Sequence, residues 1–281
     1  MASPESRAAL RGGKPARKSP PKSDAPAEKG KEPPRKNELL EWIKSIAIAV
    51  VLFLLIRTFL VQAYSIPSDS MEDTLLIGDY LMANNAVFGA RLPFVDVKLP
   101  ALRDPRHGEI VVFRPTYNQP VQDVVKRVIG IPGDTLEGRA GVVYRNGRAL
   151  DEPYVQDLGM PDQPLERQGG VSDPVVVADR SGYHNHLPAL LPAVDQAGYH
   201  PTRDNWGPLV VPAGHYWVMG DNRDSSLDSR FMGFIPRDVI RGKPLFIYFS
   251  YDKQRDAPFP RFLTTARWGR IGTGIRSCCG P

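Results

Sequence analysis

The chain has 281 residues, which is enough for one medium-sized domain or two small ones, and its 42% hydrophobic content suffices for a packed core. Its 28 prolines and 25 glycines argue for many turns and against a helical bundle. The net charge of +5 belongs to residues 1–44, because the rest of the chain carries 25 basic and 25 acidic side chains. The basic charge therefore lies in an N-terminal tail. This argues against a nucleic-acid-binding surface, and no nucleic acid is expected among the partners.

Residues 1–40 are rich in Pro, Lys, Ala and Ser and predict a disordered basic tail. The apolar run Ile43–Ala63 that follows would span about 31 Å as a helix, so residues 41–63 predict a transmembrane anchor. Arg57 interrupts the run, but it is close enough to the end for its head to reach the interface. A buried helix of a soluble domain and a cleaved signal peptide are the alternatives. The length of the run argues against the first, and the basic region of over 40 residues before it argues against the second.

Charged residues on either side of this run indicate its direction. Five basic residues lie before it or at its very start: Lys29, Lys31, Arg35, Lys36 and Lys44. Residues 64–83 contain no Lys or Arg and carry four acidic residues. The positive-inside rule then places the N-terminus in the cytoplasm and everything after residue 63 outside.

Residues 64–256 predict a mainly β extracytoplasmic domain. The expected strands are short, rich in Val, Ile, Tyr and Phe, and separated by Gly/Pro clusters: Ile110–Phe113, Val121–Ile129, Val142–Arg145, His215–Met219 and Leu245–Phe249. Asn146-Gly147 predicts a hairpin turn. Residues 157–208 hold seven prolines and no sustained period, which predicts a loop-rich insertion within a smaller lobe over residues 134–214. Residues 257–281 predict a basic C-terminal tail.

Ser70 and Lys126 are the candidate reacting residues. Ser70 lies in the sequence Ile-Pro-Ser-Asp-Ser-Met, and Lys126 lies in a run of Val and Ile that predicts a buried strand. A serine hydroxyl needs a base to become a nucleophile. A lysine can be that base when burial lowers the pKa of its amine from about 10.4. Arg127 would point to the opposite face of such a strand.

Other chemistries find little support. None of the five histidines lies in a nucleophile elbow or a zinc-binding helix motif. Residues 222–228 lack the glycine and glutamate that a calcium loop needs. No metal and no cofactor is therefore expected.

Four blocks in chain order resemble the bacterial type I signal peptidases, which are membrane-bound Ser/Lys-dyad peptidases of the S26 family: residues 64–71, 74–80, 126–134 and 220–230. The resemblance covers roughly residues 40 to 250. It implies a signal-peptidase/repressor-peptidase-like antiparallel sheet domain with a loop-rich insertion, preceded by one transmembrane helix. It also implies a single-pass serine endopeptidase of the bacterial inner (plasma) membrane, with its catalytic domain in the periplasm. Such an enzyme cleaves signal peptides from secretory preproteins after a small-x-Ala motif, through an acyl-enzyme. The resemblance implies the lipid bilayer and a nearby export translocon as its other partners.

The resemblance assigns roles to individual residues. Ser70 would be the nucleophile and Lys126 the general base, with the Ser68 hydroxyl and the Ser70 backbone N–H forming the oxyanion hole. Ser226 would orient the lysine amine, and Asp228 and Arg230 would form a supporting ion pair on one face of a strand. The positions expected to line the substrate pockets are Tyr64, Ile66, Leu81 and Val125.

Asp69 and Asp73 depart from the family pattern, which often has Gly at the first position and usually has Pro at the second. Asp69 would favour the charged lysine. A self-cleaving repressor-type peptidase is one alternative, but the chain has a tail and an anchor where a DNA-binding domain would be. A non-catalytic membrane-tethered binding module is another, although both Ser70 and Lys126 are present. After Asp256 the chain is basic and aromatic, which predicts either a lipid-binding segment or a solvated tail.

Overall fold

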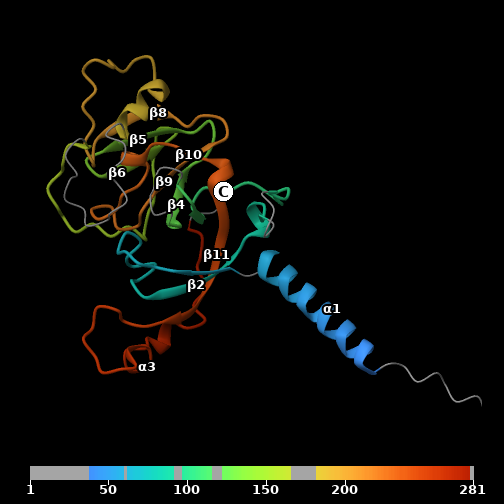
Figure 1. Cartoon of the computed structure of the whole chain (residues 1–281). Coiled ribbons are helices and arrows are strands. Elements are labelled where there is room, and N and C mark those ends of the chain that lie inside the picture. The colour runs from blue at the N-terminus through green and yellow to red at the C-terminus, as the bar shows by residue number, and fades with distance from the viewer. Residues whose placement is uncertain (1–37, 60–61, 92–96, 116–121, 166–181, 279–281) are drawn as a thin grey trace, which may run out of the picture. The chain divides into compact units, whose positions relative to one another are not determined.

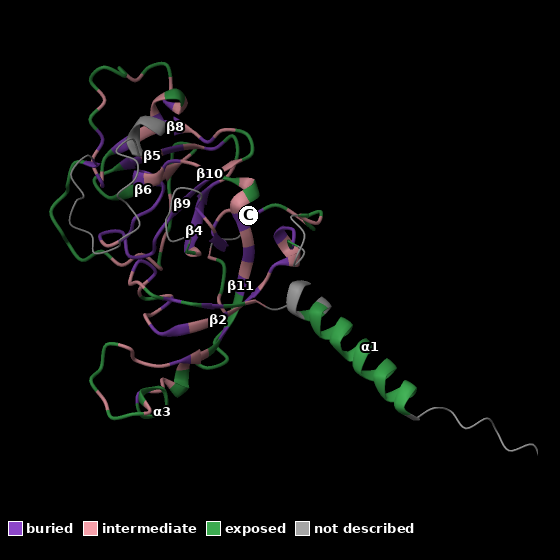
Figure 2. Cartoon of the chain, in the orientation of Figure 1, coloured by how far each residue is buried: buried purple, intermediate pink, exposed green. Residues whose placement is uncertain are grey.

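The computed structural model describes residues 38–59, 62–91, 97–115, 122–165 and 182–278 (Figure 1). Its first helix, α1 (Glu38–Phe59), has 22 residues, and its described large apolar side chains from Leu39 to Ile56 are all exposed (Figure 2). The helix ends before the expected anchor does, since Gln62 and Ala63 belong to a strand. In the described part of the chain, no helix is both long enough and apolar enough to cross a membrane. Most of the expected tail and the side chain of Arg57 lie outside the described residues.

The larger sheet contains seven strands in the order β1-β2-β11-β3-β4-β9-β10, and all neighbours are antiparallel. The strands are β1 (Gln62–Ser65), β2 (Asp79–Asn84), β3 (Ile110–Phe113), β4 (Val124–Gly130), β9 (His215–Met219), β10 (Ile235–Pro236) and β11 (Ile240–Ser250). β3 and β4 are rich in Val and Ile, and almost every residue in them is buried, as expected for strands covered on both faces. The predicted strands at 110–113 and 215–219 are confirmed with the same bounds, whereas the strand predicted from Leu245 begins at Ile240.

A second, four-stranded antiparallel sheet has the order β7-β6-β5-β8. Its strands are β5 (Thr135–Arg139), β6 (Val142–Arg145), β7 (Arg148–Ala149) and β8 (Trp206–Val210). The predicted turn at Asn146-Gly147 joins β6 to β7, with φ of 52° and 76° at the two residues, as a type I′ turn requires. Within the described residues 157–165 and 182–205 there is no strand, and a 3-10 helix, η3 (Gly182–Ala189), occupies part of the expected insertion.

Short helical turns connect the remaining strands: η1 (Ala86–Phe88), α2 (Ser229–Met232), η4 (Arg237–Val239), α3 (Arg261–Thr264) and η5 (Trp268–Arg270). Trp206 of β8 stacks on Trp217 of β9 with ring centroids 4.8 Å apart, and both indoles are buried. Such an aromatic pair stabilises the fold by about 0.5–1.5 kcal/mol beyond the effect of the surface that it buries. The two indoles therefore pack the smaller sheet against the larger one.

The C-terminal segment, residues 257–278, is folded onto the domain. Arg270 forms an ion pair with Asp79, at 2.6 Å, and Asp79 is fully buried at the start of β2. Ile275 packs against the core beneath, and Gly274 bridges to Phe246 of β11. The expectation of a tail is wrong at these residues. Composition alone suggests that the arginines here are free cations, but Arg270 and Arg267 bind groups of the folded domain.

Candidate active site

Ser70 and Lys126, 56 positions apart in the sequence, lie in direct contact. The Lys126 Nζ donates a hydrogen bond to the Ser70 Oγ at 2.5 Å. Both side chains are buried, with 7% of Ser70 and 3% of Lys126 exposed. Lys126 comes from the middle of β4, where it faces Val111 of β3. The pair therefore places an amine against a hydroxyl in a site from which most water is excluded.

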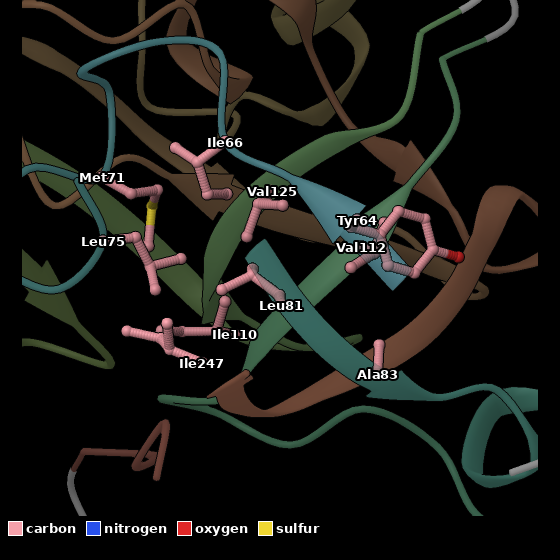
Figure 3. Close-up of a cluster of buried hydrophobic side chains, with 10 residues drawn as sticks. All are labelled: Tyr64, Ile66, Met71, Leu75, Leu81, Ala83, Ile110, Val112, Val125 and Ile247. Carbon is pink, nitrogen blue, oxygen red and sulfur yellow. The ribbon is translucent and has the colours of Figure 1, made fainter. Parts of the chain in front are cut away.

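The loop that carries Ser70 is fixed by its apolar neighbours. Met71 and Leu75 are buried in the same core cluster as Ile110 and Ile247 of the sheet. Figure 3 shows Met71 and Leu75 at one end of this cluster and Tyr64 at the other. Backbone hydrogen bonds from Glu72 to Asp69 and from Leu75 to Met71 close two turns around the serine. The position of the hydroxyl is thus set by burial of the residues that follow it.

Arg127 points away from Lys126, as the strand periodicity predicts. Its guanidinium donates two hydrogen bonds to Asp221, at 2.8 and 2.7 Å, and lies 3.8 Å from the ring centroid of Tyr154. Both members of this ion pair are almost completely buried. Thr74, four residues after the serine, also donates to Asp221 at 2.6 Å. The ion pair therefore connects β4, the serine loop and the segment after β9, a link that the sequence analysis did not foresee.

Ser68 lies beside the nucleophile candidate. Its hydroxyl oxygen is 3.4 Å from the Ser70 Oγ, and its side chain is half-buried. An oxyanion-hole donor must point to the place where the negative oxygen develops, which is close to the attacking atom. The position of Ser68 is compatible with that role.

Ser226 does not make the expected hydrogen bond. Its Oγ is buried and has no hydrogen-bond partner among the described residues. The hydroxyl instead packs against Gly220, where a Cβ would overlap both the Ser226 side chain and the Ser70 carbonyl oxygen. Only glycine lets the two loops approach so closely. The expectation that Ser226 holds the lysine amine is therefore corrected.

Asp228 and Arg230 form the expected ion pair, but not on a strand. Arg230 Nε and Nη2 each donate to the Asp228 carboxylate at 2.9 Å. Asp228 is the N-cap of α2 and also accepts from the Gly220 N–H at 3.0 Å. Burial alone would raise the pKa of Asp228, but the charge and hydrogen bonds of Arg230, the Gly220 N–H and the charge of Lys126 together lower it. The carboxylate therefore stays ionised and ties Gly220 to the helix cap.

A cavity opens at the dyad, and only two of the four expected pocket residues line it. Ile66 and Val125 are part of its wall, together with Met71, Leu227 and Met232, which the sequence analysis missed. Tyr64 and Leu81 do not line it. They lie in the core cluster under the sheet, and Leu81 is completely buried (Figure 3). The side chain at each of these two positions faces the sheet interior, where it fills space between β1, β2 and β11.

Asp69 and Asp73, the two residues that depart from the family pattern, differ in what the structure shows of them. The Asp69 carboxylate accepts a hydrogen bond from the Ser225 hydroxyl at 3.0 Å, so it links the serine loop to the 220–228 segment. Asp73 has a φ of 78°, in the left-handed region. A proline, whose ring fixes φ near −65°, could not adopt this backbone.

Comparisons with known proteins show to which family this chain is similar. The family model described as signal peptidase, peptidase S26, matches residues 39–249. A signal peptidase I of Pseudomonas aeruginosa is 32% identical, over 83% of this chain and 78% of that protein. Signal peptidase I S of Bacillus subtilis is also 32% identical, over 79% of this chain and 95% of that protein. A crystal structure of a signal peptidase I from Enterococcus faecalis is 28% identical and aligns over 51% of this chain and 98% of that chain, with a TM-score of 0.30.

The chain belongs to the S26 signal peptidase family. It is accordingly a serine peptidase, and the class of its substrates is that of preproteins with signal peptides. The matched range ends at residue 249, so the folded segment 257–278 lies outside that range.

Proposed function

We propose that this chain removes N-terminal signal peptides from exported preproteins, with Ser70 as nucleophile and Lys126 as general base. The observation that carries the proposal is the 2.5 Å contact between Nζ and Oγ in a buried site. A contact of this length lets a proton pass between the two atoms. Arg127, the other basic side chain of the strand interior, is held by Asp221 and is not available as a base.

The proposed reaction has two halves. The neutral Lys126 amine takes the Ser70 proton while Oγ attacks the carbonyl carbon of the scissile peptide bond. The Ser68 hydroxyl and the Ser70 N–H stabilise the negative oxygen that forms, and the lysine then gives its proton to the leaving amine. In the second half the same amine takes a proton from water while the water oxygen attacks the acyl carbon. The bond between that carbon and the Ser70 Oγ then breaks, and Lys126 returns the proton to Oγ. Asp228 and Arg230 keep the 220–230 segment in place behind the dyad.

Membrane anchoring is part of the proposal. The run Ile43–Ala63 is mostly apolar, and the 22 residues of α1 would be about 33 Å long at 1.5 Å per residue. With basic residues before this run and acidic residues after it, the N-terminus is placed in the cytoplasm and the catalytic domain on the periplasmic face. This is the face on which signal peptides emerge from the export translocon.

A cleavage assay on a purified precursor with an Ala-x-Ala site tests the dyad. Ser70→Ala and Lys126→Ala should each lose at least 10³-fold in rate, because a triad-type nucleophile and base act as one unit. Lys126→Arg should be equally inactive, since a guanidinium does not act as a base near neutral pH.

The matched controls are Ser65→Ala, at an exposed position of β1, and Lys253→Ala, near Tyr80. They remove the same groups at residues that do not line the cavity. Both should cleave at close to the normal rate. If folded Lys126→Arg cleaved at a comparable rate, the general-base assignment would be wrong.

A further inference from the structure

Tyr154, in the segment that follows β7, lies against Arg127, the residue next to Lys126 on β4. The carbon at the centre of the Arg127 guanidinium is 3.8 Å from the centroid of the Tyr154 ring, a distance at which the face of the ring attracts the cation. The same guanidinium donates two hydrogen bonds to Asp221. Because Lys126 and Arg127 are consecutive on one strand, contacts that hold Arg127 in place also help to fix the Lys126 amine.

The Tyr154 hydroxyl is connected to the other reacting residue. It donates to the Glu152 carboxylate at 2.8 Å, and burial and the charge of Glu152 raise its pKa, so the hydroxyl keeps its proton. Glu152 accepts from Arg223 at 3.0 and 2.5 Å, and only 9% and 8% of these two side chains are exposed. The Arg223 Nε donates to the Gly220 carbonyl at 3.0 Å. Gly220 packs against the Ser70 carbonyl, so this series of contacts ends at the nucleophile candidate.

The same segment is joined to the residues around Asp221 through its backbone. The Gln156 N–H donates to the Asp221 carbonyl at 2.9 Å, and the Gln156 carbonyl accepts from the Arg223 N–H at 3.3 Å. Between these two residues, the Asn222 N–H donates to the Ser70 carbonyl at 3.2 Å. A displacement of the segment would therefore move the peptide group that binds the backbone of Ser70.

A cavity of about 710 Å³ adjoins this group of side chains. Its wall includes Tyr154, Arg127 and Thr74, together with residues 273–278. The Arg127 and Asp221 side chains are nevertheless only 2% and 0% exposed. Since the Tyr154 ring covers the guanidinium, a smaller side chain at this position would admit water from the cavity to the ion pair. Water would weaken the attraction between the two charges, because it raises the local dielectric constant.

We propose that Tyr154 is a positioning residue that keeps the Lys126 amine within hydrogen-bond distance of the Ser70 hydroxyl. Its ring acts on the base through Arg127, and its hydroxyl acts on the nucleophile through Glu152. Tyr154 is not among the described residues that line the cavity at the dyad, so its loss should slow the chemical step without weakening substrate binding. The inference rests on the roles proposed above for Ser70 and Lys126.

Steady-state cleavage of an Ala-x-Ala precursor by the full chain in maltoside micelles tests the proposal. Tyr154→Leu removes the ring and the hydroxyl, Tyr154→Phe keeps the ring, and Glu152→Gln removes the charge that holds Arg223. The control is Tyr144→Leu, because Tyr144 of β6 lies over Arg139 of β5 at 5.0 Å and does not line the cavity at the dyad. Each variant is assayed below its own melting transition, which circular dichroism measures.

We expect kcat of Tyr154→Leu to fall by roughly 10- to 100-fold with KM changed less than about twofold, since small displacements at a distance can cost about 100-fold in rate. Tyr154→Phe and Glu152→Gln should each lose about two- to fivefold in kcat, and Tyr144→Leu less than about twofold. Retention of the ring in Tyr154→Phe should thus recover most of the activity, which a general loss of stability would not explain.

A normal kcat in folded Tyr154→Leu, an equal loss in Tyr144→Leu, or a change mainly in KM would overturn the positioning role. If Tyr154→Leu does not fold, the other two variants decide, and a normal kcat in both refutes the proposal. Failure of the proposed function is distinguishable from these results, because Ser70→Ala would then cleave no more slowly than the natural chain.

Discussion

The ion pair between Arg270 and Asp79 should contribute far more to stability than its position near the C-terminus suggests. Arg270 donates to both carboxylate oxygens, at 3.1 and 2.6 Å, and to the Thr74 carbonyl at 3.0 Å. Asp79 is completely buried, while 23% of the Arg270 side chain is exposed. Removing one partner of a buried pair costs about 3–5 kcal/mol because a charge is left uncompensated. Water that reaches the exposed part of Arg270 reduces this, so we expect Arg270→Ala to cost about 2–3 kcal/mol.

Urea unfolding and thermal melting of the full chain measure this effect. At about 2–4 °C per kcal/mol for a domain of this size, the melting temperature should fall by roughly 4–12 °C. The control is Arg261→Ala in the same segment. Its pair with Asp256 has 53% and 100% of the two side chains exposed, so its loss should cost at most about 0.5 kcal/mol. If Arg270→Ala and Arg261→Ala destabilise equally, the C-terminal segment does not support the serine loop in the way described.

Two further predictions concern pH and specificity. Burial lowers the pKa of His186 to about 4, and it outweighs the hydrogen bond to the Ser229 carbonyl, which raises the pKa. The imidazole is therefore neutral in the folded state. The stability that it contributes is present above the unfolded pKa of about 6.5 and is lost as pH falls towards 4, by up to about 3 kcal/mol. His186→Phe should therefore lose less unfolding free energy than the natural chain between pH 7 and 4.5, and an equal loss would contradict this. In a precursor series, Ala should be strongly favoured at −1 and small or Val-sized residues at −3, because Ile66 and Val125 narrow the cavity. Equally fast cleavage after a large −1 residue would refute the role given to these two side chains.

The parts of the fold that could be predicted are those with a local cause. β3 is a continuous run of β-branched and aromatic residues, β9 is rich in them, and Asn146-Gly147 specifies its own turn. β2 was missed because its alternation begins with Asp79, a buried carboxylate that no hydrophobic pattern reveals. The carboxylate is satisfied by the distant Arg270 and by the Leu76 N–H, which donates to it at 2.9 Å.

The expectations about the site were wrong where the motif gave a residue's place in the sequence but not its secondary structure or the direction of its side chain. Asp228 was expected on a strand, although Asp before Ser229–Met232 and Gly233 after it are ordinary start and stop signals of a short helix. Leu81 was expected in a pocket because of its place in a motif, but the register of β2 turns that side chain into the core. Sequence motifs identify which residues occupy the site region. They do not determine which face of a strand each side chain takes.

The position of Ser70 depends on segments that are far apart in the chain. β4 supplies the amine, and the segment after β9 approaches through Gly220, where any Cβ would overlap the Ser70 carbonyl. The C-terminal segment holds the other end of the same loop, because Arg270 binds the Thr74 carbonyl and Arg267 binds the Ile77 carbonyl at 2.8 Å. Both arginines lie outside residues 39–249, the range that matches the family. The serine loop is therefore supported both by segments within the range that matches the family and by the C-terminal segment that follows this range.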